Sequence, residues 1–214
     1  RSRPVIAIDM QGHGHTADRQ GPASFEPMAD DVAAVLDHLS VPRAHIVGHS
    51  LGGQVALAMA IRHAARCASI TPISGMQRLE GYLPDIVASQ RDPNHVPSPE
   101  VAALFPTEED FAAWKAHFDR VNPNPASFDD VLVKLNQLLA TWPGFTDAEF
   151  AAIACPTLVM IGDTDSTLPE HAVEMKRTIP NAALAVIPGA THMNIIRKSA
   201  TIVPMIEANA ARAG

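Results

Sequence analysis

Short apolar segments alternate along this chain with longer segments that have helical spacing. Buried strands are predicted for five apolar runs, at Pro4–Met10, Ala44–Gly48, Cys67–Ile73, Thr157–Gly162 and Ala183–Ile187. Amphipathic or apolar helices are predicted at Glu26–Leu39, Gly52–His63, Pro169–Thr178 and Ile195–Ala210. Strands that are apolar throughout and separated by helices are typical of a parallel sheet covered on both faces. The alternation therefore predicts an α/β fold with a mostly parallel sheet flanked by helices.

The region between the third and fourth predicted strands has a different pattern. Helical segments at Glu108–Arg120 and Phe128–Thr141 are separated by the Pro- and Asn-rich stretches DPNHVPSP and VNPNPAS, and no strand pattern is evident. We predict a helical cap or lid at 75–152, inserted into a core formed by 1–74 and 153–214.

The composition restricts the partners that this chain is expected to bind. Of its 214 residues, 47% are hydrophobic and 18% are charged, and the net charge is −7 without a cluster of Lys or Arg. This balance argues against nucleic acid or an anionic membrane as a partner. The apolar runs are far shorter than the ~20 residues of a membrane span. We expect a cytoplasmic protein that acts on a small molecule, and the sequence leaves its oligomeric state open.

The second predicted strand leads directly into the sequence GHSLGG. A G-x-S-x-G motif between a strand and a helix places a serine on a sharp turn, with its hydroxyl exposed above the sheet. Glycines two positions before and after the serine prevent collisions in this strained turn. We interpret Ser50 as a nucleophile and the Leu51 N–H as an oxyanion donor at the helix N-terminus. The alternative is a Gly-rich helix start with a capping serine.

A serine nucleophile needs a general base, and the base needs an acid that orients it. Functional residues of parallel sheets collect beyond the carboxyl ends of the strands. Two further predicted strands end at GDTD and PGATH, which contain Asp163, Asp165 and His192. The order Ser…Asp…His is the one expected for this arrangement. Of the other histidines, His171 is expected to be exposed at a helix start and His49 to pack under the serine turn.

Four blocks carry a resemblance to a known family: IDMQGHGHT, VGHSLGG, TLVMIGDTDSTLP and AVIPGATHMN, in this order. The chain resembles the α/β-hydrolase superfamily, and within it the small serine esterases and lactonases with a helical lid. The resemblance implies Ser50 as nucleophile, Asp165 as triad acid, His192 as general base and the Leu51 N–H as oxyanion donor. Family members usually read G-x-x-D after this strand, which favours Asp165 over Asp163. Some relatives carry the acid after the preceding strand. This chain reads TPISG there and has no carboxylate, which favours Asp165 further.

The stretch IDMQGHGHTAD raises the alternative of a metal site, because it contains two histidines and an aspartate. A binuclear zinc hydrolase would show H-x-H-x-D-H, but Asp18 comes one position late and Arg19 stands where the last histidine would be. The resemblance explains the stretch as a turn in which Gly12 and Gly14 form the bend and His13 hydrogen-bonds within the loop. We therefore expect neither a metal nor a cofactor.

Family members usually have three strands before the one that Pro4–Met10 resembles, and an HG-containing loop after the third supplies the second oxyanion donor. Neither is found in this sequence. The third of these strands would lie between Pro4–Met10 and Ala44–Gly48, and each buried backbone group left unpaired costs ~1–3 kcal/mol. We expect either an incomplete chain, and therefore an incomplete enzyme, or direct pairing of these two strands.

The predicted activity is hydrolysis of a small, largely apolar ester or lactone through a Ser-His-Asp triad and an acyl-enzyme. The candidate substrate-binding residues are Met76, Tyr82, Trp114, Trp142 and Met193. A C–C bond hydrolase and a cofactor-free perhydrolase would use the same triad, and a small-molecule sensor or an inactive fragment would share the scaffold. The fold does not separate these alternatives.

Overall fold

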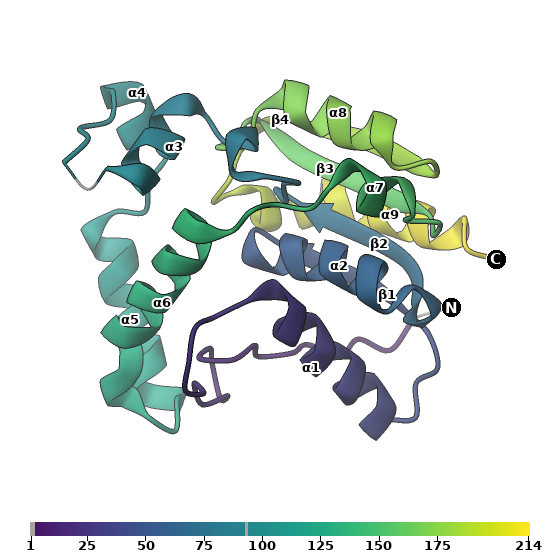
Figure 1. Cartoon of the computed structure of the whole chain (residues 1–214), viewed down its shortest axis with the longest axis horizontal. Helices are drawn as coiled ribbons and strands as arrows, with labels where there is room; N and C mark the ends of the chain where they lie inside the picture. The colour runs from purple at the N-terminus through teal and green to yellow at the C-terminus, as the bar shows by residue number, and fades with distance from the viewer. Residues whose placement is uncertain (1–2, 93) are drawn as a thin grey trace. The chain divides into compact units, whose positions relative to one another are not determined.

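A parallel sheet forms the centre of the compact unit that comprises 25–105 and 139–214 (Figure 1). The computed structural model describes residues 3–92 and 94–214. Within these residues the strands are β1 (Ala44–His49), β2 (Cys67–Ile73), β3 (Thr157–Thr164) and β4 (Ala182–Thr191), and they pair in the order β1-β2-β3-β4. Each strand runs parallel to its neighbour. The predicted α/β class with a parallel sheet is confirmed.

Helices cover both faces of this sheet. Helix α2 (Leu51–Arg62) packs on β1 and β2, α8 (Pro169–Thr178) packs on β3 and β4, and α9 (Ser199–Ala211) packs on β2 and β3. Figure 1 shows α2 in front of the sheet and α9 behind it. Helix α1 (Phe25–His38) lies against α2. These positions follow from sequence, because α2 consists mainly of small and apolar residues that allow close packing, and its residues from Gly53 to Ala60 are buried.

The core between the sheet and the C-terminal segment is made of aliphatic side chains. Its buried members are Ile73, Leu158, Met160, Ile187, Ala190, Ile195 and Ile202. They come from β2, β3, β4, the 3-10 turn Ile195–Arg197 and α9. Burial of apolar surface stabilises the folded state by about 25 cal/mol per Å². Because these side chains come from β2, β3 and β4, their packing holds the ends of the three strands together. This anchoring matters because the candidate site lies at those ends.

The strand predicted at Pro4–Met10 is wrong. Residues 3–10 form no regular structure, Val5 is 89% exposed, and the sheet begins with β1. The alternative of direct pairing with the strand at Ala44–Gly48 is also not realised. An apolar run becomes a strand only when a neighbour supplies hydrogen bonds, and the family strands that would flank this run are not in the sequence.

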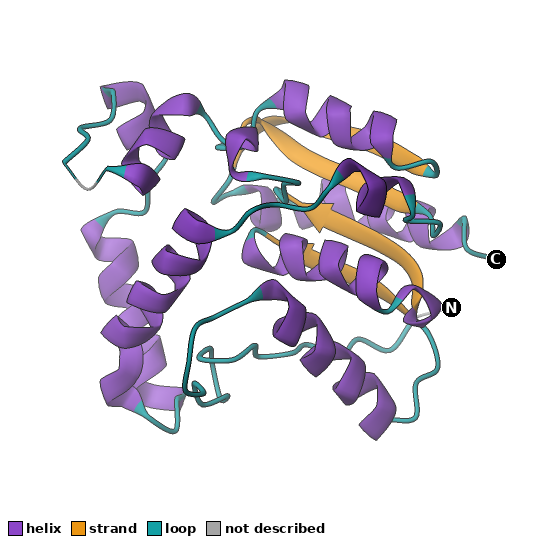
Figure 2. Cartoon of the chain, in the orientation of Figure 1, coloured by secondary structure: helices purple, strands orange, loops and turns teal. Residues whose placement is uncertain are grey.

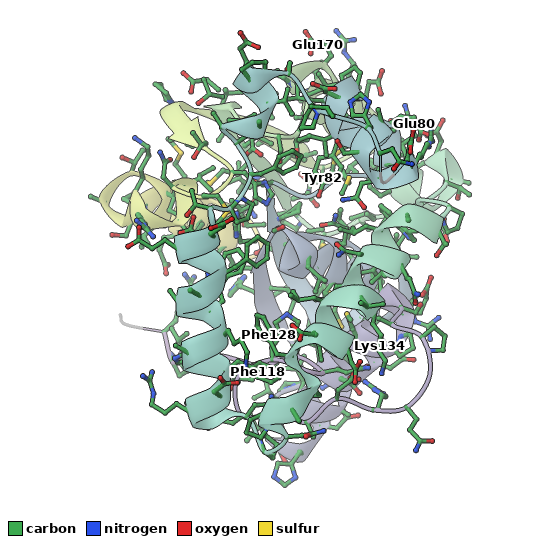
Figure 3. The ribbon with its side chains drawn as sticks, turned by 90° about the vertical axis from the view of Figure 1, so that its left-hand side faces the viewer. Glu80, Tyr82, Phe118, Phe128, Lys134 and Glu170 are labelled. Atoms are coloured by element: carbon green, nitrogen blue, oxygen red, sulfur yellow. The ribbon has the colours of Figure 1, made fainter. Side chains whose placement is uncertain are left out.

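The chain separates into two compact units. The unit that contains the sheet comprises 25–105 and 139–214, and the other comprises 1–24 and 106–138. In the second of these, Phe118 of α5 (Glu108–Val121) and Phe128 of α6 (Phe128–Thr141) meet edge to face with ring centroids 5.3 Å apart (Figure 3). Lys134 of α6 pairs there with the carboxylate of Asp18. The predicted division into a core of 1–74 and 153–214 and a cap of 75–152 differs from these units and stays a prediction.

The described residues between β2 and β3 form helices, turns and loops (Figure 2). Besides α5 and α6 they include α3 (Pro84–Arg91), α4 (Pro99–Ala102) and α7 (Asp147–Ala151). The helical character predicted for this region is therefore observed. Across the part of the chain that the structure describes, we find no helix with the length and apolarity that a membrane crossing would require.

Candidate active site

Ser50 is the single residue between strand β1 and helix α2. Its backbone has φ 55° and ψ −120°, a conformation that is unfavourable for a residue with a Cβ atom. Gly48 makes the turn possible, because a Cβ atom there would lie 1.9 Å from the carbonyl oxygen of Gly52. The Ser50 N–H donates to the carbonyl of Ile73 over 2.9 Å, which fixes the turn to the end of β2. The sharp turn expected from GHSLGG is thus present.

His192 follows β4 and lies between the other two predicted site residues. Its Nε2 atom is 2.9 Å from the Ser50 Oγ, and its Nδ1 atom is 3.0 Å from the Asp165 Oδ1. A carboxylate oxygen can only accept, so Nδ1 carries the proton in this hydrogen bond and Nε2 is left to accept from the Ser50 hydroxyl. The structure therefore brings Ser50, His192 and Asp165 together in one continuous hydrogen-bonded chain.

Asp165 lies in the loop after β3, and its carboxylate is buried. Its Oδ2 atom accepts from the Gly162 N–H at 3.1 Å and from the Ser74 hydroxyl at 2.5 Å. Its Oδ1 atom accepts from the Thr167 N–H at 3.3 Å, in addition to His192. Each oxygen of the carboxylate is thus held by more than one donor.

These contacts decide the charge of Asp165. Burial acts to raise the pKa of this carboxyl group, but the hydrogen bond and charge of His192 and the donors Ser74 and Gly162 outweigh it. The net effect lowers the pKa of Asp165 to about 2. The group is consequently an anion at neutral pH, as a residue that orients an imidazole must be.

Asp163, the alternative acid, has other partners. Its carboxylate accepts from the N–H groups of Gly189 and Ala190 at 2.9 and 3.2 Å. Both donors belong to β4, so Asp163 braces the ends of β3 and β4 against each other. No contact between Asp163 and His192 is recorded among the described residues, whereas Asp165 makes one.

His49 does more than pack under the serine turn. Its Nε2 atom donates to the carbonyl oxygen of His192 over 2.8 Å, and the two rings lie 4.9 Å apart. Burial, followed by the nearby charge of His192, lowers the pKa of His49. A neutral His49 therefore connects the strand that precedes Ser50 to the loop that carries His192.

Two serines near Asp165 were not identified from the sequence. The Ser74 hydroxyl contacts Oδ2, and the Ser166 hydroxyl lies 2.9 Å from the Nδ1 of His192 and 3.3 Å from the Oδ1 of Asp165. A signal for each was available, because Ser166 directly follows the predicted acid and Ser74 occupies the strand end where some relatives carry theirs. Ser166 lies within the block TLVMIGDTDSTLP, but neither serine occupies a position to which the motifs assign a role.

The expectation that His171 is exposed is wrong. It is only 4% exposed, and its Nε2 atom accepts from the Gln77 N–H at 3.0 Å. Gly81 allows this burial, because a Cβ atom there would lie 2.2 Å from the His171 ring. Burial lowers the pKa of His171, and the positive charge of Arg78 adds to this effect. His171 is therefore a neutral acceptor that fixes the segment after β2 to α8.

The predicted substrate-binding residues have different surroundings. Met76, Tyr82 and Trp142 are buried, and Met193 beside His192 is half-buried. Tyr82 (Figure 3) pairs through an isolated antiparallel bridge with Thr167, two residues after Asp165. Trp114 belongs to the other compact unit and is 39% exposed. A role of these side chains in substrate binding stays a prediction.

The stretch with two histidines forms a turn, as the resemblance implies. The Nδ1 of His13 lies 2.9 Å from the carbonyl of Gln11, and Gly12 and Gly14 have φ of 69° and 49°. The Nδ1 of His15 lies 2.9 Å from the Oδ2 of Asp9. Among the described residues, no group of three or more His, Cys, Asp or Glu side chains is arranged to hold a metal ion.

A model of the alpha/beta hydrolase family matches residues 1–203. The chain belongs to this family. The matched range contains all three members of the hydrogen-bonded chain, Ser50, Asp165 and His192.

Known proteins similar to this hydrolase include one curated relative and two solved structures. The relative is the dihydrolipoyllysine-residue acetyltransferase component of the acetoin cleaving system of Pseudomonas putida, which is 30% identical over 201 residues. The alignment covers 89% of this chain but 52% of the relative, so the chain spans about half of that protein's length.

The first solved structure is an N-acyl homoserine lactone degrading enzyme, with 29% identity and a TM-score of 0.68, covering 94% of this chain and 80% of that chain. The second is a thermophilic esterase, with 26% identity and a TM-score of 0.70, covering 96% and 79%. Both matches extend over nearly all of this hydrolase.

Proposed function

We propose that this alpha/beta hydrolase is a serine hydrolase that cleaves a small ester or lactone through an acyl-enzyme. The observation that carries the proposal is the hydrogen-bonded chain from the Ser50 hydroxyl through His192 to Asp165, with Ser50 on the sharp turn between β1 and α2. Nucleophile, base and orienting acid in contact are what acyl transfer by a serine requires.

In the proposed mechanism the Ser50 oxygen attacks the substrate carbonyl carbon while its proton passes to the Nε2 of His192. Asp165 holds the Nδ1–H of the imidazole and stabilises the imidazolium that forms. The Leu51 N–H is in the first turn of α2, where backbone amides lack an intrahelical acceptor, and donates to the oxyanion. The imidazolium then protonates the leaving alcohol. In the second half-reaction His192 takes a proton from water, and the water oxygen attacks the acyl carbon. The bond from that carbon to the Ser50 oxygen then breaks, the imidazolium returns the proton to this oxygen, and the acid is released.

The similarity to a lactone degrading enzyme and an esterase supports an ester or lactone as substrate. A C–C bond hydrolase would need a basic residue that faces the pocket, and Arg78, which follows β2, is the residue to consider. Its guanidinium lies 2.8 Å from the Glu174 carboxylate, which provides no support for that alternative. An apolar pocket formed by Met76, Tyr82 and Met193, the absence of a cofactor and a cytoplasmic location remain parts of the proposal.

A fluorophosphonate probe tests the nucleophile. The probe should label the protein, Ser50→Ala should abolish labelling, and His192→Gln should slow it strongly. Ser40→Ala is a matched control, because Ser40 also has a positive φ of 55° but lies after α1. Equal labelling of the Ser50→Ala variant and the unmodified protein would exclude the proposed mechanism.

Substrate class is tested with a panel of p-nitrophenyl esters and lactones of increasing acyl length, assayed by colour and by pH-stat. We expect turnover of the short members that is lost in Ser50→Ala. Saturable binding without turnover would instead identify a small-molecule sensor on this scaffold. Peracid formation from acetate and hydrogen peroxide would identify a perhydrolase.

A further inference from the structure

Ser74 is a buried serine that has a strained backbone. It directly follows β2 and has φ 51°, in the left-handed region that favours glycine. Its N–H donates to the carbonyl of Met160 on β3 over 2.7 Å, and its hydroxyl donates to the Oδ2 of Asp165 over 2.5 Å. A glycine would satisfy the backbone at this position without strain, but it would not provide the hydroxyl.

We propose that Ser74 is a positioning residue whose hydroxyl fixes the carboxylate of Asp165 so that Oδ1 faces His192. The contribution of this contact to catalysis rests on the proposed hydrolase function. The contact between Ser74 and Asp165 is observed whether or not the protein is a hydrolase. Ser74 touches no reacting atom and acts only through Asp165. Its strained backbone is the kind that persists only when the surrounding structure imposes it, and such strain is concentrated at functional sites.

The orientation of a carboxylate must be imposed by its partners, because the terminal torsion of Asp is broad. Here the two oxygens have separate sets of donors. Oδ1 faces His192, the Thr167 N–H and the Ser166 hydroxyl. Oδ2 faces Ser74 and the Gly162 N–H. Of the two contacts to Oδ2, the hydroxyl at 2.5 Å is shorter than the amide at 3.1 Å. Hydrogen bonds to a charged acceptor are the strong ones, so Ser74 has the larger part in preventing rotation.

The Ser74 hydroxyl therefore restrains the geometry of the contact with His192. Without it, Oδ2 keeps only the longer backbone contact, and the carboxylate is freer to rotate away from the Nδ1–H of His192. The hydrogen bond between Nδ1 and Oδ1 should then lengthen on average and its proton should become more shielded. A serine that only filled space would not change this proton when its hydroxyl is removed.

Proton NMR of the full chain tests the proposal through the low-field resonance of the His192 Nδ1–H. Ser74→Ala and Ser74→Gly both remove the hydroxyl, and only the glycine relieves the strain. Both variants should move the resonance upfield, and both should be labelled by the fluorophosphonate about tenfold more slowly. The glycine variant provides the answer if the alanine variant does not fold. Ser69→Ala is the matched control, because Ser69 is a buried serine of β2, the strand that Ser74 follows, and its hydroxyl lies 2.9 Å from His45.

An Asp165→Asn background separates positioning from general damage. There Ser74→Ala should change the labelling rate by less than about twofold, because the carboxylate through which the hydroxyl acts is gone. An unchanged resonance and labelling rate in both Ser74 variants would overturn the proposal. A resonance that moves as expected in a protein that the probe never labels would leave the positioning role standing and refute the hydrolase function.

Discussion

Replacement of Ser50 by glycine should stabilise the fold relative to replacement by alanine, although both variants lack the nucleophile. Ser50 has φ 55° and ψ −120°, and its side chain makes no capping hydrogen bond to α2. Both substitutions remove the hydrogen bond from Ser50 to His192, so this loss cancels when the two variants are compared. The difference between them isolates the cost of placing a Cβ atom on this backbone.

The magnitude follows from two opposing effects. A non-glycine residue in a sparsely populated backbone region costs ~1–3 kcal/mol. Glycine adds flexibility to the unfolded chain, which costs about 0.5–1 kcal/mol relative to alanine. We therefore expect the free energy of unfolding of Ser50→Gly to exceed that of Ser50→Ala by about 1 kcal/mol. In a chain of this size the melting temperature should rise by roughly 2–4 °C.

Urea unfolding followed by circular dichroism measures this difference, with equal slopes required for the two variants. Ser40→Gly and Ser40→Ala provide a second pair at a positive φ outside the candidate site. A glycine variant at position 50 that is no more stable than the alanine variant would show that the turn stores no strain. The interpretation of the GHSLGG segment as a strained nucleophile turn would then fail.

Three further substitutions follow from the same geometry. Asp165→Asn should lower kcat for an ester by roughly 10⁴-fold without unfolding the protein, because an amide can favour the wrong imidazole tautomer of His192; ester kinetics and circular dichroism check this. Gly48→Ala should destabilise the protein by more than ~4 kcal/mol, or prevent folding, because its Cβ atom would lie 1.9 Å from the Gly52 carbonyl oxygen; urea unfolding checks this. Because the pKa of His171 is lowered in the folded state, the unfolded chain binds more protons, and the free energy of unfolding should fall as the pH drops below the ordinary value of 6.5. His171→Gln should reduce this pH dependence, which urea titrations at pH 7.5 and 5.5 measure.

Local patterns predicted most elements of the fold. The strand at Cys67–Ile73 and the helix at Phe128–Thr141 have the predicted bounds. The apolar pattern that predicts each element lies within the segment, and the turn residues that end it are its sequence neighbours. The run at Pro4–Met10 has an equally apolar pattern but forms no strand. Its state depends on a hydrogen-bonding neighbour elsewhere in the chain, which local periodicity does not reveal.

The same difference applies to the candidate site. The sequence predicts Ser50, Asp165 and His192 as site residues because each follows a predicted strand within a motif. The contact between Ser74 and Asp165 could not be predicted in this way, because it depends on β2 and β3 being neighbours with Ile73 opposite Met160. The burial of His171 likewise depends on Gly81, which lies 90 positions away in the sequence and leaves room for its ring.

The sheet itself holds both strained serines of the site in place. Ser50 and Ser74 each follow a strand, and each donates its N–H to the neighbouring strand, to Ile73 and Met160 respectively. Ser40 also has a positive φ, but it follows α1 and donates back to Asp37, which is an ordinary way to end a helix. The pairing of β1 with β2 therefore fixes the position of Ser50. The pairing of β2 with β3 fixes the position of Ser74, which contacts Asp165. For this reason the strain is located at the strand ends where the chemistry is proposed to occur.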